Sequence, residues 1–242
     1  MSCFSVKAEK AAGRTVVRDI AFTSPLKAAK PFYREDHTEV MMMAASAGIL
    51  DGDRREITVE AATGAALKFT EQSYTKVFRA ADRGAEQSVL INVQDGAAVY
   101  FAAQPIIPFA GSRFRSSTEV RLTKSARFAC SEVISCGRAA MGERFRFDSI
   151  ISRTAVYVGG RLRMLDLTRL IPEESGLSGI GFFEGKTHIG MLYCFNYTPT
   201  PAPDEHMAIS RAAEGLIIRA VSDSADELSR RFEELMSGFF TK

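Results

Sequence analysis

A repeat of about thirty residues is the sequence feature that most restricts the folds that this 242-residue chain can adopt. A strand-like segment, a small turn residue, an alanine and a second strand-like segment occur three times, with the turn residues at Gly64, Gly96 and Ser125. These turn residues are 32 and 29 positions apart, and a looser copy follows 35 positions later at Gly160. Repeats of this kind stack so that neighbouring units share one core. The repeat therefore predicts stacked β layers; the alternative is chance recurrence in an all-β chain with many glycine turns.

Alternation of apolar and polar residues supports the same fold class. It is found around Ile57 and Val59, around Val89 to Val93, and again through 161–167 and 189–195. Such alternation indicates strands with one buried face. Because no helical segment separates these strands, a doubly wound α/β sheet is disfavoured. We predict a mainly β fold of stacked, β-helix-like layered sheets, in one domain over residues 1–242 with its β body at about 13–197.

The end of the chain has a different pattern. A proline-rich break occupies 198–203, and Asp204 after it is a suitable cap for a helix. Apolar residues then recur at helical spacing, at Met207, Ala212, Leu216 and Ala220. A capping box at Ser224 to Glu227 opens a second helix, whose apolar stripe is formed by Leu228, Phe232, Leu235 and Phe239. The sequence predicts a helical hairpin over about 204–240, packed on the β body or, alternatively, offering Phe239 and Phe240 to a partner.

Charge and hydropathy exclude several classes of protein. Thirty-one basic against twenty-nine acidic residues leave a net charge of +2, too small for broad attraction to nucleic acid or to an acidic membrane. The longest apolar run, Val40 to Leu50, is about half of what a membrane-spanning helix needs. The first ten residues contain no apolar signal region. We therefore expect a cytoplasmic protein with no nucleic-acid or membrane partner and with four reduced cysteines.

Fragments of known motifs do not complete a site. Gly185-Lys186-Thr187 lacks the first glycine of a phosphate loop and precedes a strand, whereas a phosphate loop must open a helix. Asp51-Gly52-Asp53 lacks the later oxygen ligands of a calcium loop and indicates a tight turn. Cys130, Glu132 and Cys136 fall on one face of a strand, as a soft-metal edge or, more simply, as half-buried thiols. No motif for a catalytic nucleophile is present.

Six sequence motifs between Gly13 and Leu170, in this order and spacing, resemble one known family. They are Ser24-Pro25-Leu26 with Lys30-Pro31-Phe32-Tyr33, Gly48-Ile49-Leu50-Asp51-Gly52-Asp53, Thr75-Lys76-Val77-Phe78-Arg79, Gln104-Pro105-Ile106-Ile107-Pro108-Phe109, Ser112-Arg113-Phe114-Arg115, and Glu132-Val133-Ile134-Ser135-Cys136-Gly137-Arg138 leading into Gly142-Glu143-Arg144-Phe145-Arg146-Phe147. Together they resemble the urease accessory protein family UreD, called UreH in some species.

The resemblance implies a β-rich, non-catalytic scaffold. By this resemblance the chain binds the accessory protein UreF and, through it, the GTPase UreG, and the assembly docks on apo-urease to help deliver nickel. No permanent metal or cofactor is implied, only transient nickel passage, which widely spaced oxygen donors suit better than a closed cage. An alternative from another class is a stacked-β enzyme that acts on acidic carbohydrate.

The resemblance and the polar residues within its motifs together give candidate site residues. Thr75, Glu132 and Asp148 are the candidates for the polar lining of an internal passage for nickel. A second set is expected to fix loops or to face partners: Lys76, Arg79, Arg115, Gly137, Arg138 and Gly142.

Overall fold

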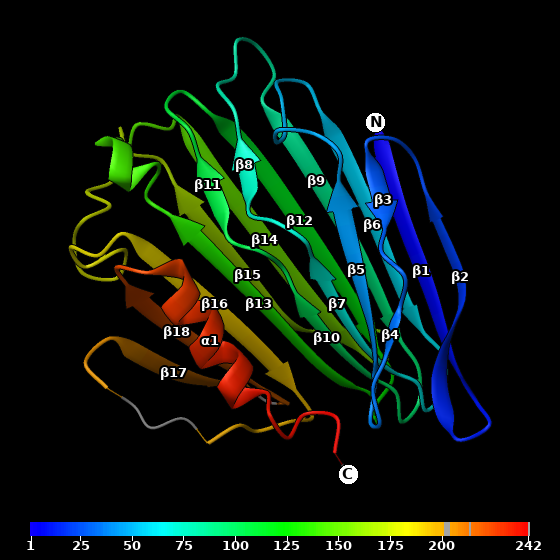
Figure 1. Cartoon of the computed structure of the whole chain (residues 1–242). Helices are drawn as coiled ribbons and strands as arrows, with labels where there is room; N and C mark the ends of the chain where they lie inside the picture. Colours follow the sequence, from blue (N-terminus) through cyan, green and yellow to red (C-terminus); the bar gives the residue numbers. More distant parts are fainter. Residues whose placement is uncertain (201–203, 213, 242) are drawn as a thin grey trace.

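The repeat folds into the rungs of a two-sheet β-solenoid (Figure 1). In the computed structural model, which describes residues 1–200, 204–212 and 214–241, each of three rungs runs along one sheet, turns, and returns along the other. Equivalent strands of successive rungs are parallel and in register, so that Val59, Ile91 and Val120 are direct neighbours. The mainly β, layered fold predicted from the repeat is confirmed.

Two sheets contain most of the strands. Sheet A has the order β15 (Arg161–Leu170), β14 (Ser149–Val158), β12 (Arg113–Leu122), β9 (Ala85–Val93), β6 (Arg54–Ala61), β1 (Ser2–Ala11), β2 (Arg14–Phe22). Sheet B has the order β17 (Met207–Ala212), β18 (Gly215–Ser222), β16 (His188–Phe195), β13 (Arg127–Ser135), β10 (Ala98–Ala102), β7 (Ala66–Glu71), β5 (Thr38–Ala44), β3 (Leu26–Ala28). The short strands β4 (Phe32–Tyr33), β8 (Thr75–Val77) and β11 (Ile106–Pro108) pair beside this path, and the short 3₁₀ helix η1 (Ala139–Met141) follows β13.

The corner between the two sheets explains why a small turn residue followed by alanine recurs in each copy of the repeat. At each corner the N–H of the repeat alanine donates to the carbonyl three residues earlier: Ala65 to Ala62, Ala97 to Gln94 and Ala126 to Thr123, at 3.0, 3.0 and 3.2 Å. All three repeat alanines are fully buried. A larger side chain at these positions would have to enter a closely packed interior, which is costly.

The looser copy at Gly160 is not a rung, and this part of the prediction is wrong. Gly159 and Gly160 join β14 and β15 as an antiparallel pair within sheet A. Both glycines have positive φ, 56° and 77°, which is what a two-residue hairpin turn requires. The chain therefore folds back in its own sheet at this point, and β15 becomes the edge of sheet A.

The first half of the predicted helical hairpin is also wrong. Met207–Ala212 and Gly215–Ser222 form the antiparallel strands β17 and β18, and in β18 Leu216, Ile218 and Ala220 alternate with less buried residues. The helical spacing of the apolar residues was a subset of a period-two pattern rich in β-branched residues. Part of the proline-rich break, 201–203, lies outside the described residues.

The second helix, α1 (Ala225–Leu235), is confirmed together with its capping box. The Ser224 hydroxyl accepts from the N–H of Glu227 at 3.2 Å. Helix α1 covers the outer face of sheet B (Figure 1). There Phe232 packs directly on Gly190. Phe239, beyond the helix, is fully buried beside Tyr197, so the stripe packs on the β body as expected. No helix within the described part of the chain is long and apolar enough to cross a membrane.

Candidate functional site

A row of polar side chains crosses the inner face of sheet A, between the two sheets. It consists of Arg55, Gln87, Ser116 and Ser152, each the direct neighbour of the next in the parallel register. Because in-register residues of parallel strands point to the same face, the row follows from one polar residue on each of the four adjacent strands β6, β9, β12 and β14. Arg55, Ser116 and Ser152 are buried, and we call this set the polar row.

Sheet B places two carboxylates opposite the polar row. Glu132, on β13, accepts a hydrogen bond from the Ser152 hydroxyl through Oε1 at 2.8 Å. Its Oε2 is buried and has no hydrogen-bond partner among the described residues. Burial raises the pKa of Glu132 to about 7, although the Ser152 hydrogen bond works in the opposite direction. Glu132 therefore has one buried oxygen that is free to bind a cation or hold a proton.

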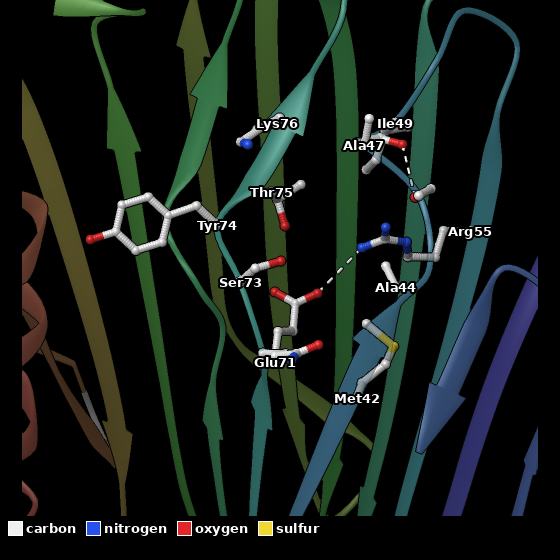
Figure 2. A pocket seen from close by; sticks show the side chains of 13 residues that line it. Met42, Ala44, Ala47, Ile49, Arg55, Glu71, Ser73, Tyr74, Thr75 and Lys76 are labelled. Atoms are coloured by element: carbon white, nitrogen blue, oxygen red, sulfur yellow. Dashed lines mark hydrogen bonds and ion pairs between the residues drawn. The ribbon is translucent and has the colours of Figure 1, made fainter. Parts of the chain in front are cut away.

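The second carboxylate, Glu71, forms an ion pair within the structure. Arg55 Nη1 lies 3.3 Å from Glu71 Oε1, and the two side chains are each 8% exposed. The Gln104 N–H donates to Glu71 Oε2 at 3.1 Å. Figure 2 shows the Arg55 guanidinium directed at this carboxylate, with the Thr75 hydroxyl on the same side of the cavity. Burial raises the pKa of Glu71, and the charge of Arg55 opposes the shift.

Two cavities meet at Glu71 and Thr75. One, of about 140 Å³, is also lined by Tyr74 and Lys76 and is seen in Figure 2. The other, of about 30 Å³, extends between the sheets to Glu132. The smaller cavity has room for a water molecule or two and is lined by enough polar groups to hold them. Glu71 and Glu132 are thus connected through small spaces lined by both polar and apolar side chains.

Beyond Glu132, a third set of polar groups continues across the interior. Asp166 accepts from the Tyr193 hydroxyl at 2.6 Å and pairs with Arg219 at 2.5 Å. Asp166 is next to Thr154 in the register, and its charge adds to the upward shift of the pKa of Glu132. A further cavity of about 170 Å³ adjoins Arg219 and His206. Polar groups therefore extend from the Lys76 cavity to the Arg219 cavity.

The structure brings together two of the three predicted passage residues. Thr75 lies where the first two cavities meet, and Glu132 lies at the inner end of the smaller one. Asp148 is placed elsewhere: its carboxylate is 54% exposed and lies 3.6 Å from Arg113, and it lines neither of these two cavities. Asp148 therefore lies apart from Thr75 and Glu132.

The residues predicted to fix loops or face partners are more widely spread. Lys76 is exposed at the cavity in Figure 2, Arg79 is exposed after β8, and Arg115 is exposed on the outer face of sheet A. Arg138 stacks over Phe109 at 4.2 Å and pairs with Glu143.

The two predicted glycines belong to the same loop as Arg138. Gly137 has φ +126° and lies so close to the Glu143 carbonyl that a Cβ would come within 2.6 Å of its oxygen. Gly142 ends η1 in a left-handed conformation. The Gly137–Gly142 loop is therefore held by backbone geometry and by the Arg138–Glu143 pair, while its partner contacts stay a prediction.

Reasoning from the sequence missed most of the polar row, although a signal was present. Arg55, Gln87 and Ser116 each stand nine positions before the turn residues Gly64, Gly96 and Ser125. Aligning the three repeat copies on their turns would have shown a polar residue at this position in every copy, whereas the position four residues later, on the same face, is apolar in every copy. Glu71 and Glu132 likewise stand seven positions after the turn residues Gly64 and Ser125, where the second copy has Ala103, so the same alignment would have placed the two carboxylates at one level of sheet B.

The other sequence motifs form no site. The Asp51 carboxylate accepts hydrogen bonds from four consecutive backbone N–H groups, those of residues 81 to 84, at 2.7 to 3.1 Å. It thus fixes a turn, as expected. Lys186 pairs with Asp223 and precedes strand β16. Among the described residues, no three His, Cys, Asp or Glu side chains gather as metal ligands, so Cys130, Glu132 and Cys136 form no metal edge.

Comparison with known proteins gives a consistent result. Residues 2–240 match the sequence profile of the UreD urease accessory protein family. The chain is 37% identical over 239 residues to urease accessory protein UreD of Acetivibrio thermocellus, covering 92% of this chain and 91% of that protein. It is 30% identical to urease accessory protein UreH of Helicobacter hepaticus, with 89% of both chains covered. It is 32% identical to urease accessory protein UreH of Helicobacter pylori, strain J99, covering 76% of this chain and 70% of that protein.

Proposed function

The chain belongs to the UreD urease accessory protein family, and from this premise we propose that it is a non-catalytic scaffold for the maturation of urease. In this role it binds UreF and, through it, the GTPase UreG, and the assembly docks on apo-urease. Nickel is the cargo of this assembly and passes through the polar interior of the chain. The names of the relatives support the maturation role, and the geometry of the polar row supports the passage of the ion.

The observation that carries the proposal is the free oxygen of Glu132. A buried carboxylate oxygen without a hydrogen-bond partner lowers the stability of the fold, because burial removes its hydration. Its presence in a native structure therefore points to a functional role. Here it lies at the end of a polar cavity that leads from the surface at Lys76. An oxygen at this position can replace part of the water shell of a divalent cation while the ion moves between the sheets.

The chemistry of the donors suits transfer more than storage. Glu71, Thr75, Glu132 and Ser152 supply oxygen atoms from different strands, and none of them belongs to a closed ligand cage. Sites with few and separated hard donors hold nickel weakly, whereas clustered imidazole or thiolate ligands would retain it. Arg55 neutralises Glu71 at the entrance, so a cation that approaches Glu71 must displace the guanidinium, which already lies 3.4 Å from Gln87.

The test uses the chain co-expressed with UreF, UreG and apo-urease. We expect Glu132→Gln, which removes the charge and preserves the shape, to lower the nickel content of purified urease while the accessory complex still assembles. Nickel is measured by elemental analysis, and assembly by pull-down with UreF. Glu35→Gln, the same change at an exposed position, is the control and should leave both readouts unchanged.

Two results would contradict the proposal. Full nickel loading of urease by the complex that contains Glu132→Gln would refute the passage of nickel by way of Glu132. Failure of the unaltered chain to bind UreF, together with cleavage of an acidic polysaccharide, would favour the alternative of a stacked-β enzyme.

A further inference from the structure

Strand β15 is an apolar free edge of sheet A. Among the described residues it pairs only with β14. Leu162, Leu165 and Leu167 on this strand are 49%, 55% and 59% exposed. An edge strand also directs the N–H and C=O of every second residue away from its only neighbour. Natural proteins cover or charge such edges, and an exposed apolar one marks a place where another polypeptide binds.

The leucines lie on the outer face of sheet A, away from the polar row. Met164 and Asp166 point inward, so the alternating positions Leu165 and Leu167 point outward. In the register Leu165 faces Ala155 on β14, and this alanine is fully buried although it lies on the outer face. Leu165 therefore covers Ala155, while Leu165 and Leu167 themselves stay more than half exposed beside β14.

Sheet B extends past the β15 edge and forms a step beside it. Asp166 contacts Tyr193 on β16 and Arg219 on β18, so β15 lies over these two strands. Strand β17 lies one strand further out, and its residues Ala208 and Ser210 are exposed. In the register Ala208 is the neighbour of Arg219, so it shares the face that points toward sheet A. A strand added to β15 would lie on this step, over the β17–β18 hairpin.

The charge around the edge is basic. Strands β14 and β15 contain four arginines, Arg153, Arg161, Arg163 and Arg169, against the single acid Asp166, which is paired with Arg219. Arg163 pairs with Glu214, and Arg169 with Glu174. Within the part of the chain that the structure describes, Arg153 and Arg161 have no acidic partner. The register places Arg153 directly opposite Leu167, so apolar and basic groups share one surface.

We propose that the β15 edge is the docking site for an extended segment of a maturation partner, in which apolar residues are combined with acidic ones. The segment adds to sheet A as a further strand, packs apolar side chains on Leu165 and Leu167, and places acidic ones near Arg153 and Arg161. The inference rests on the proposed function in one respect: the segment belongs to a partner of this scaffold in urease maturation.

The test measures binding of UreF to the full chain. We expect the double variant Leu165→Glu and Leu167→Glu to weaken binding by about tenfold or more, since the new carboxylates disrupt the apolar contact and repel an acidic segment. Leu50→Glu is the matched control, because Leu50 is exposed to the same extent as Leu165 and lies outside β15. Hydrogen exchange of the wild-type complex should show protection of the β15 amides.

The outcomes separate the two proposals. If wild-type chain binds UreF but the double variant binds equally well and the β15 amides exchange as in the free chain, the docking site is refuted and the proposed function stands. If wild-type chain does not bind UreF at all, the proposed function fails. If the Glu variants abolish a dimer of the free chain without changing UreF binding, the edge pairs with a second copy and the proposal is overturned. If the double variant does not fold, UreF binding is measured with the charge reversals Arg153→Glu and Arg161→Glu. Weaker binding of UreF by these variants, with protection of the β15 amides in the wild-type complex, supports the docking site, and unchanged binding without protection refutes it.

Discussion

The most direct test of the buried carboxylate is the stability of Glu132→Gln as a function of pH. The folded protein raises the pKa of Glu132 from 4.5 to about 7, mainly because burial disfavours the charged form. The folded state therefore holds a proton that the unfolded state releases. In the wild type, the contribution of Glu132 to stability is fully present below the unfolded pKa and is lost as the pH rises toward the folded pKa.

The magnitude follows from the size of the shift. A change of about two and a half pKa units corresponds to about 3 kcal/mol of free energy of unfolding. Glutamine retains an oxygen that can accept from the Ser152 hydroxyl and never ionises, so the variant lacks this loss. Urea unfolding followed by circular dichroism should give similar stabilities for the two proteins near about pH 4 and a more stable variant near about pH 8.

Parallel pH profiles of wild type and Glu132→Gln would refute the buried, proton-holding carboxylate. Glu35→Gln serves again as the control for loss of one exposed glutamate. Together with the nickel readout, this measurement distinguishes two roles. A variant that is more stable at neutral pH yet delivers less nickel shows that the carboxylate is kept at a cost in stability, as is common at functional sites.

Three further variants test the packing and capping of α1 and the buried ion pair of the site. Phe232→Ala should cost about 3 to 5 kcal/mol in urea unfolding, because this fully buried ring packs on Gly190 under α1. Ser224→Ala removes the cap of the same helix and should cost about 1 kcal/mol by the same assay. Glu71→Ala leaves the buried guanidinium of Arg55 without its partner and should cost about 3 to 5 kcal/mol, a loss that the double variant with Arg55→Leu should largely reverse if the penalty comes from the unpaired charge.

The rungs could be predicted from the sequence because their determinants are local and repeated. Each corner needs a small turn residue followed by a residue that fits a closed interior, and Gly64-Ala65, Gly96-Ala97 and Ser125-Ala126 meet this requirement. The copy at Gly160 misled because glycine serves both this corner and a two-residue hairpin. What distinguishes them is the second glycine with positive φ, which sends the chain back into the same sheet.

The remaining features depend on contacts between distant segments. The β17–β18 hairpin has apolar residues that fit either period, and the choice is made by β16, which pairs with β18 over its whole length. The Arg55–Glu71 pair joins residues of two different sheets, and no spacing in the chain indicates it. Glu132 was identified as a candidate from a sequence motif, but its free oxygen and its raised pKa depend on burial that only the fold shows.

The polar row is not needed to hold the solenoid together, and the same strands show why. Four residues further along these strands, Val59, Ile91, Val120 and Val156 form an equivalent in-register row that is wholly apolar and fully buried. Apolar side chains in the polar row would pack equally well and would avoid the cost of burying ionic groups. The fold thus contains, two rows apart on one face, a row that packs as an ordinary apolar core and a polar row that we propose serves the passage of a cation between the sheets.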